Sequence, residues 1–124
     1  MINGSITLTA GEALAANIVV KLSSGNAVAG TANAVPVGIS KYAAASGALV
    51  AIDTLNHEGT LEVIAGGAIS QGADVYVGSD GKVTALSESA GTYYKVGVAL
   101  EAATESGQKI TIIPCPALPA VVTL

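Results

Sequence analysis

The most constraining feature of this 124-residue sequence is an internal repeat, because one half of the chain aligns with the other. The offset between matched residues drifts from 55 to 60, so a few single-residue insertions separate the copies. A repeat of this length predicts two similar multi-strand units that share one core, as in a small pseudo-symmetric barrel or sandwich. The aligned segments are 6–14 with 61–69, 17–20 with 74–77, 37–39 with 96–98, 46–47 with 106–107, and 50–52 with 110–112.

Apolar and polar residues alternate in several short segments, which is typical of strands with one buried face. Residues 24–26 and 79–82 have the composition of hairpin turns, and the alanine-rich segments 42–48 and 99–105 could each hold one helical turn. We therefore predict an all-β fold with short helical turns. The alternating apolar residues are Ile6 and Leu8, Ile18 to Leu22, Leu61 and Val63, Val75 and Val77, Val96 and Val98, and Ile110 and Ile112. The glycines expected at turns are Gly25, Gly38, Gly47, Gly81, Gly97 and Gly107.

The composition is poor in charge, since 11% of the residues are charged and 51% are hydrophobic. Ordinary soluble domains carry about 25% charged residues, so part of this surface is expected to be covered by other molecules. The length fits one domain over residues 1–113, with pseudo-repeats at about 5–53 and 60–113. Because Phe and Trp are absent, its core must be aliphatic, and oligomerisation would compensate for the small side chains.

Residues 114–124 (PCPALPAVVTL) form a distinct proline-rich, uncharged tail. Its prolines disfavour a helix or a central strand and favour an extended conformation. An apolar terminus is expected to pack, either on its own domain or on a neighbouring chain. We predict that the tail or the N-terminal segment reaches a neighbouring molecule. The candidate contact residues are Ile2, Ile6, Leu8, Pro114, Pro116, Leu118, Val121 and Leu124.

Several functional classes are disfavoured by the sequence. Arginine is absent and the five lysines are scattered in a chain of net charge -4, so direct binding of nucleic acid is not expected. The uncharged stretch 22–40 is interrupted by polar residues and proline, which argues against a membrane span. No secretory signal peptide is recognised, and synthesis in the cytoplasm is expected. Cys115 is the single cysteine, which excludes an internal disulfide.

No catalytic arrangement emerges from the reactive residues, and we expect neither an enzyme nor a cofactor. Asp53, His57 and Glu58 could ligate a metal, but with one histidine in the chain they are better explained as a polar loop between the repeats. Tyr93 and Tyr94 could form a stacking platform for a sugar. These tyrosines suggest a small ligand- or carbohydrate-binding β module as one candidate function.

Residues 68–112 resemble the capsid cement, or head decoration, proteins of tailed bacteriophages. The resemblance rests on Gly72-Ala73-Asp74-Val75-Tyr76-Val77, the turn at Asp80-Gly81-Lys82-Val83, the run from Val96 to Ala103, and Gly107 followed by Ile110 and Ile112. The first half of the chain has a weaker form of this pattern. The resemblance implies a β-rich homotrimer that binds the major capsid protein on the outside of an icosahedral shell. There it would clamp adjacent capsomers against the pressure of packaged DNA. The alternative function is a small ligand- or carbohydrate-binding β module of a phage fibre or a cell-surface protein.

Overall fold

The computed structural model describes residues 5–55, 59–86 and 90–122, and these residues form strands with one short 3-10 helix. None of the helices in these ranges is long and apolar enough to cross a membrane. Unit 1 contains β1 (Ser5–Thr9), β2 (Val19–Ser23), β3 (Asn26–Ala29), β4 (Gly38–Ser40) and β5 (Leu49–Thr54). Unit 2 contains β6 (Leu61–Ile64), β7 (Asp74–Val77), η1 (Ser79–Gly81), β8 (Val83–Thr84), β9 (Gly91–Ala99) and β10 (Lys109–Val122).

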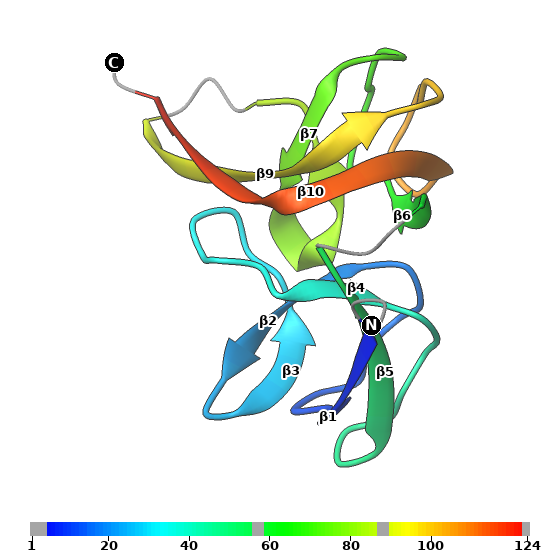
Figure 1. Ribbon diagram of the computed structural model, residues 1–124, viewed down its shortest axis with the longest axis vertical. Helices are drawn as coiled ribbons and strands as arrows, with labels where there is room; N and C mark the ends of the chain where they lie inside the picture. The colour runs from blue at the N-terminus through cyan, green and yellow to red at the C-terminus, as the bar shows by residue number, and fades with distance from the viewer. Residues whose placement is uncertain (1–4, 56–58, 87–89, 123–124) are drawn as a thin grey trace.

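Each unit is one antiparallel five-stranded sheet, and the two sheets have the same topology (Figure 1). The strand order is β1-β5-β4-β2-β3 in unit 1 and β6-β10-β9-β7-β8 in unit 2. Replacing each strand of unit 1 by the one five places later in the chain reproduces the order of unit 2. The prediction of an all-β fold built from two similar units is confirmed. The architecture is sandwich-like, and neither sheet is a closed barrel in the described residues.

Backbone hydrogen bonds repeat between the units in detail. Gly47 N–H donates to the Ala10 carbonyl at 2.8 Å, and Gly107 N–H donates to the Ala65 carbonyl at 2.8 Å. The alanine-rich segments 42–48 and 99–105 are therefore not helical, contrary to the prediction. Their alanines instead form isolated antiparallel bridges, Ala44 with Leu14 and Ala103 with Ile69, and these bridges use the backbone groups that a helical turn would need.

The structure corrects the alignment of the second strand in each repeat. Asn17 N–H donates to the Ser40 carbonyl at 2.9 Å, and Gly72 N–H donates to the Ala99 carbonyl at 2.8 Å. Asn17 and Gly72 both have positive φ, at 61° and 85°, which asparagine and glycine tolerate best. Residues 17–20 are thus equivalent to 72–75, and the predicted match to 74–77 is shifted by two residues.

Two of the predicted turn glycines lie inside strands. Gly38 is in β4 and Gly97 is in β9, where a Cβ atom would stand 2.3 Å from the Asp53 carbonyl oxygen and 2.4 Å from the Ile113 carbonyl oxygen, respectively. At these equivalent positions glycine permits close approach of the neighbouring strand. The other predicted glycines have positive φ: Gly25, Gly47 and Gly107 lie in turns, and Gly81 is the last residue of η1.

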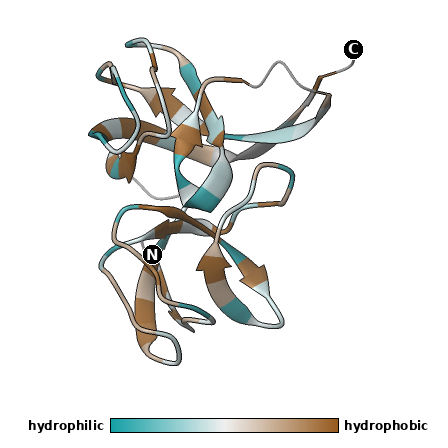
Figure 2. Cartoon of the chain, turned by 180° about the vertical axis from the view of Figure 1, so that it is seen from behind, coloured by the Kyte–Doolittle hydropathy of each residue, from teal (hydrophilic) through white to brown (hydrophobic). Residues whose placement is uncertain are grey.

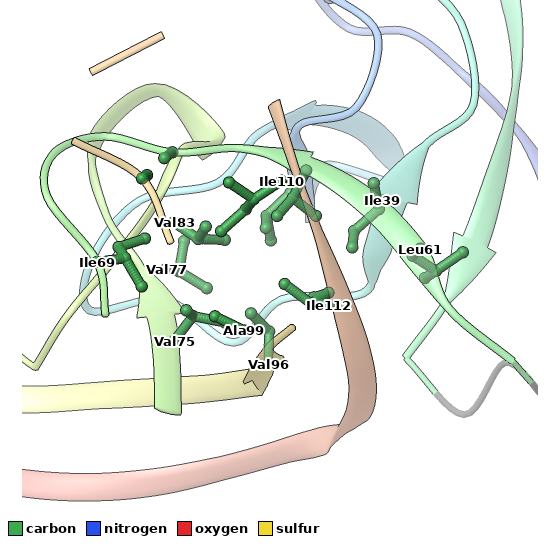
Figure 3. Close-up of a cluster of buried hydrophobic side chains, with 14 of the residues drawn as sticks. Ile39, Leu61, Ile69, Val75, Val77, Val83, Val96, Ala99, Ile110 and Ile112 are labelled. Atoms are coloured by element: carbon green, nitrogen blue, oxygen red, sulfur yellow. The ribbon is translucent and has the colours of Figure 1, made fainter. Parts of the chain in front are cut away.

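The apolar interior consists of two clusters, one for each unit, and the units share their contacts. The larger cluster lies in unit 2 and also contains Val19, Ile39 and Leu55 of unit 1 (Figure 3). In the other direction, Ile64 of unit 2 packs against the cluster of unit 1. Val19 and Val20 are both fully buried, because β2 has one cluster on each face. The expectation that only one face of this strand is buried was therefore wrong.

Within the described ranges, two backbone hydrogen bonds join the units directly. Ile64 N–H donates to the Asn17 carbonyl at 2.9 Å, and Gly81 N–H donates to the Gly30 carbonyl at 2.9 Å. A Cβ atom at Gly81 would stand 2.5 Å from the Val19 carbonyl oxygen, so the backbones of the two units approach closely at η1. Shared apolar contacts and these bonds hold the two units in one fold.

Candidate interaction surface

Eight large apolar side chains are exposed in the described residues, and they lie on both units. Scattered apolar residues are normal on a protein surface, whereas a gathered group marks an interaction site. The eight are Ile6, Leu22, Val35, Tyr42 and Leu49 in unit 1, and Leu86, Leu100 and Ile113 in unit 2.

The outer β1–β5 face, which we define by Thr7, Tyr42, Leu49 and Ala51, brings two of these side chains onto one surface. Thr7 pairs with Ala51 and Thr9 with Leu49, so their side chains alternate with the buried residues Val50 and Ile52. The Ala51 N–H donates to the Tyr42 hydroxyl at 3.2 Å, which places the ring beside this face. Leu49 is 64% exposed and Tyr42 is 49% exposed.

The N-terminal contact residues predicted from the sequence have different surroundings. Ile6 is 40% exposed at the edge strand β1, so it is accessible to another molecule. Leu8 is partly buried and packs against the apolar cluster of unit 1. Ile2 lies outside the described residues. Whether these residues contact a partner stays a prediction.

The proline-rich tail is extended, as predicted, and most of it belongs to strand β10. Residues 118–122 pair with 91–95 of β9, after a register shift between Pro114 and Leu118. β6 pairs with β10 only as far as Ile112, so the proline-containing part has a strand on one side alone. This segment and 91–95 of β9 form a two-stranded arm, which extends to the upper left in Figure 1. The side chains of Pro116, Leu118 and Val121, and the whole of Leu124, lie outside the described part.

The arm is connected to the rest of the molecule by polar contacts. Asn33 of unit 1 donates from its side-chain nitrogen to the Thr92 carbonyl at 2.8 Å. Lys95 forms an ion pair with Asp74 at 3.1 Å, and the hydrogen bond to this carboxylate raises the pKa of the lysine. Cys115 lies near the Lys95 carbonyl, and burial raises the pKa of its thiol. A raised pKa disfavours the reactive thiolate.

The two adjacent tyrosines do not form the platform that a sugar site would use. Tyr93 is 6% exposed, and Tyr94 is partly buried against the cluster of unit 2. Successive side chains of a strand point to opposite faces, so Tyr93 and Tyr94 cannot stack on the same ligand.

The remaining candidate polar residues do not gather into one site in the described parts of the chain. Asp53 is 8% exposed and lies 3.7 Å from the Lys41 amino group, and His57 and Glu58 lie outside the described residues. No group of three or more metal-ligating side chains occurs in the described ranges. A polar cleft of about 350 Å³ lies beside the β2–β3 hairpin and η1. Its lining residues are Glu12, Lys21, Ser23, Val28, Ala29, Gly30, Thr31 and Asp80.

The fold and this surface define a small two-unit β module with exposed apolar side chains. The model of the phage cement protein family matches residues 2–114, so the chain belongs to that family. It is a structural phage protein associated with the capsid of the virion. No curated protein was found to match the chain.

A solved structure supports the fold. The chain is similar to the head fiber gp8.5 N base of bacteriophage phi29, with a TM-score of 0.73 and 22% sequence identity. The similarity covers 94% of this chain and 98% of the other. The family match ends at residue 114, so the last ten residues of the chain, including the part of β10 in the arm, lie beyond it.

Proposed function

We propose that this protein binds the outer surface of an assembled icosahedral shell and holds adjacent capsomers together. The observation that carries the proposal is the family match over residues 2–114. A molecule that binds only the assembled shell stabilises the assembled state by mass action. Many copies on one closed surface act together, so each copy needs only a modest interface.

In this proposal the protein acts as a homotrimer and its partner on the shell is the major capsid protein. A bridging subunit needs at least two contact surfaces, one for the shell and one for a neighbouring copy. The exposed apolar side chains of both units support this arrangement, since Tyr42 and Leu49 lie in unit 1 and Ile113 lies in unit 2. The low charge of the chain supports it as well. The role requires binding alone, and it involves no catalytic step or cofactor.

The test uses the purified full chain and expanded shells assembled without it. Light scattering with size-exclusion chromatography gives the mass in solution, and cosedimentation with the shells gives binding. We expect a trimer, either in solution or on the shell, and a higher temperature of shell disruption when the protein is bound. A stable monomer that does not cosediment with expanded shells would contradict the proposal.

A further inference from the structure

The duplication allows the outer faces of the two units to be compared position by position. The Lys41 N–H donates to the Ala51 carbonyl at 3.0 Å, and the Leu100 N–H donates to the Thr111 carbonyl at 2.9 Å. Tyr42 is therefore equivalent to Glu101. Their roles match too, because the Tyr42 hydroxyl accepts the Ala51 N–H, and the Glu101 carboxylate accepts the Thr111 N–H at 2.9 Å.

The equivalent positions carry different chemistry. Unit 1 has Thr7, Tyr42 and Leu49, and unit 2 has Glu62, Glu101 and Lys109 in their places. Lys109 and Glu62 are 3.9 Å apart, so Glu101 leaves the face of unit 2 with a net negative charge. At one end of the faces the charged residues lie in unit 1 and the apolar residues in unit 2. There Lys41 corresponds to Leu100, and Asp53 corresponds to Ile113.

This reverse exchange leaves the face of unit 1 without net charge. Lys41 and Asp53 form an ion pair, and the Asp53 side chain is only 11% exposed. The same contrast holds for the whole units. Residues 5–54 contain two carboxylates and two lysines, which sum to zero, whereas residues 60–113 contain six carboxylates and three lysines, which sum to -3. In Figure 2 the strands of unit 1, in the lower half, show brown segments together with teal segments in the β2–β3 hairpin, and brown segments occur in unit 2 as well.

We propose that the outer β1–β5 face is the surface that binds the shell, and that unit 2 points toward solvent. The inference rests on the proposed function and adds an orientation to it. The expected partner surface is an uncharged, apolar patch of the shell. Strand β1 carries no charged residue, β5 carries only Asp53, and Asp53 is paired with Lys41, the neighbour of Tyr42 in the sequence.

The size of the face favours the shell over a second copy of this chain as its partner. Aromatic side chains bury about 150–250 Å² each, so the exposed parts of Tyr42 and the smaller Leu49 offer on the order of 200 Å² together. A stable interface between two proteins buries about 800 Å² per partner. A surface this small does not hold a dimer together in solution. It suffices for binding to the shell, because several copies that associate through another surface bind repeated sites on the shell at the same time.

The chain provides a matched control for the test. The double variant Tyr42→Glu with Leu49→Lys places on unit 1 the residues that the same fold accepts in unit 2, so it should fold. The reciprocal variant Glu101→Tyr with Lys109→Leu is the control. Binding to expanded shells lacking the protein is measured by cosedimentation, and folding by circular dichroism and thermal melting. We expect at least a tenfold loss of apparent affinity for the first variant and less than a twofold change for the second.

Each outcome has a distinct meaning. Binding of the Tyr42→Glu, Leu49→Lys variant at the wild-type level would overturn the inference, as would a larger loss in the reciprocal variant. A fall in the solution mass of the first variant would also overturn it, because the face would then lie between copies. If this variant fails to fold, the single variant Leu49→Lys, at the more exposed position, replaces it. Its shell binding and solution mass are then judged in the same way. Failure of the wild-type protein to bind shells would instead refute the proposed function.

Discussion

Substitution of Gly97 by alanine tests the close approach that both units of the fold share. The added Cβ atom would stand 2.4 Å from the Ile113 carbonyl oxygen and 3.1 Å from its carbonyl carbon. Ile113 belongs to β10 and is paired with Val98, so this backbone cannot move away without disturbing the strand pairing.

The expected loss follows from two opposing effects. Overpacking of this kind costs up to about 3 kcal/mol. Replacing glycine by alanine also restricts the unfolded chain, which recovers about 0.4–1 kcal/mol. The net loss for Gly97→Ala is therefore about 2 kcal/mol, or a fall in Tm of about 8 °C for a domain of this size. Gly38→Ala, at the equivalent position in β4, should behave in the same way.

Gly67→Ala is the matched control, because a Cβ atom at Gly67 meets nothing within 4 Å and its φ lies outside the left-handed region. Its stability should stay within about 0.5 kcal/mol of the wild type. Urea unfolding and thermal melting, both followed by circular dichroism, measure the three variants. Equal stability of the Gly97 and Gly67 variants would refute the reasoning about close strand approach.

Three further predictions concern the core, the tail and alkaline pH. Ile112→Ala removes a fully buried side chain of unit 2 and should lower the free energy of unfolding by about 2–5 kcal/mol in urea titrations. Deletion of residues 114–124 should preserve the β-sheet circular dichroism signal but weaken oligomer formation or shell binding. A loss of folding would show instead that the tail belongs to the core. The folded chain holds the protons of Lys95 and Cys115 more tightly than the unfolded chain, since both pKa values are raised. The contribution of these two groups to stability should therefore be fully present at pH 8 and be lost as the pH rises above about 9. Asp74→Asn should reduce the part of this loss that depends on Lys95.

Most of what could be predicted about the fold from the sequence followed from the internal repeat. Alternation located the strands, and the pair Gly47 and Gly107 located equivalent turns, because both signals depend on local chain geometry. The alignment of 17–20 was wrong since the decisive property was a positive φ, which Asn17 and Gly72 satisfy with different side chains. The pattern of apolar residues alone did not show that 17–20 aligns with 72–75 and not with 74–77.

Other features depend on contacts between segments that are distant in the sequence. Val19 and Val20 are both buried because unit 2 covers the outer side of β2, and a pattern within one strand does not contain that information. The roles of Gly38 and Gly97 depend in the same way on a neighbouring strand. The outer β1–β5 face was missed as well. Tyr42 contacts Ala51 of β5, and Leu49 pairs with Thr9 of β1, only through the fold. The exchange of Leu49 for Lys109 between the repeats was nevertheless a readable signal.

Cryo-electron microscopy of expanded shells decorated with the purified protein tests the central claim most directly. The account predicts density on the outer surface where neighbouring capsomers meet, grouped in threes, with unit 1 against the shell and unit 2 outward. Isolated copies bound within a single capsomer, or density with unit 2 nearest the shell, would contradict it.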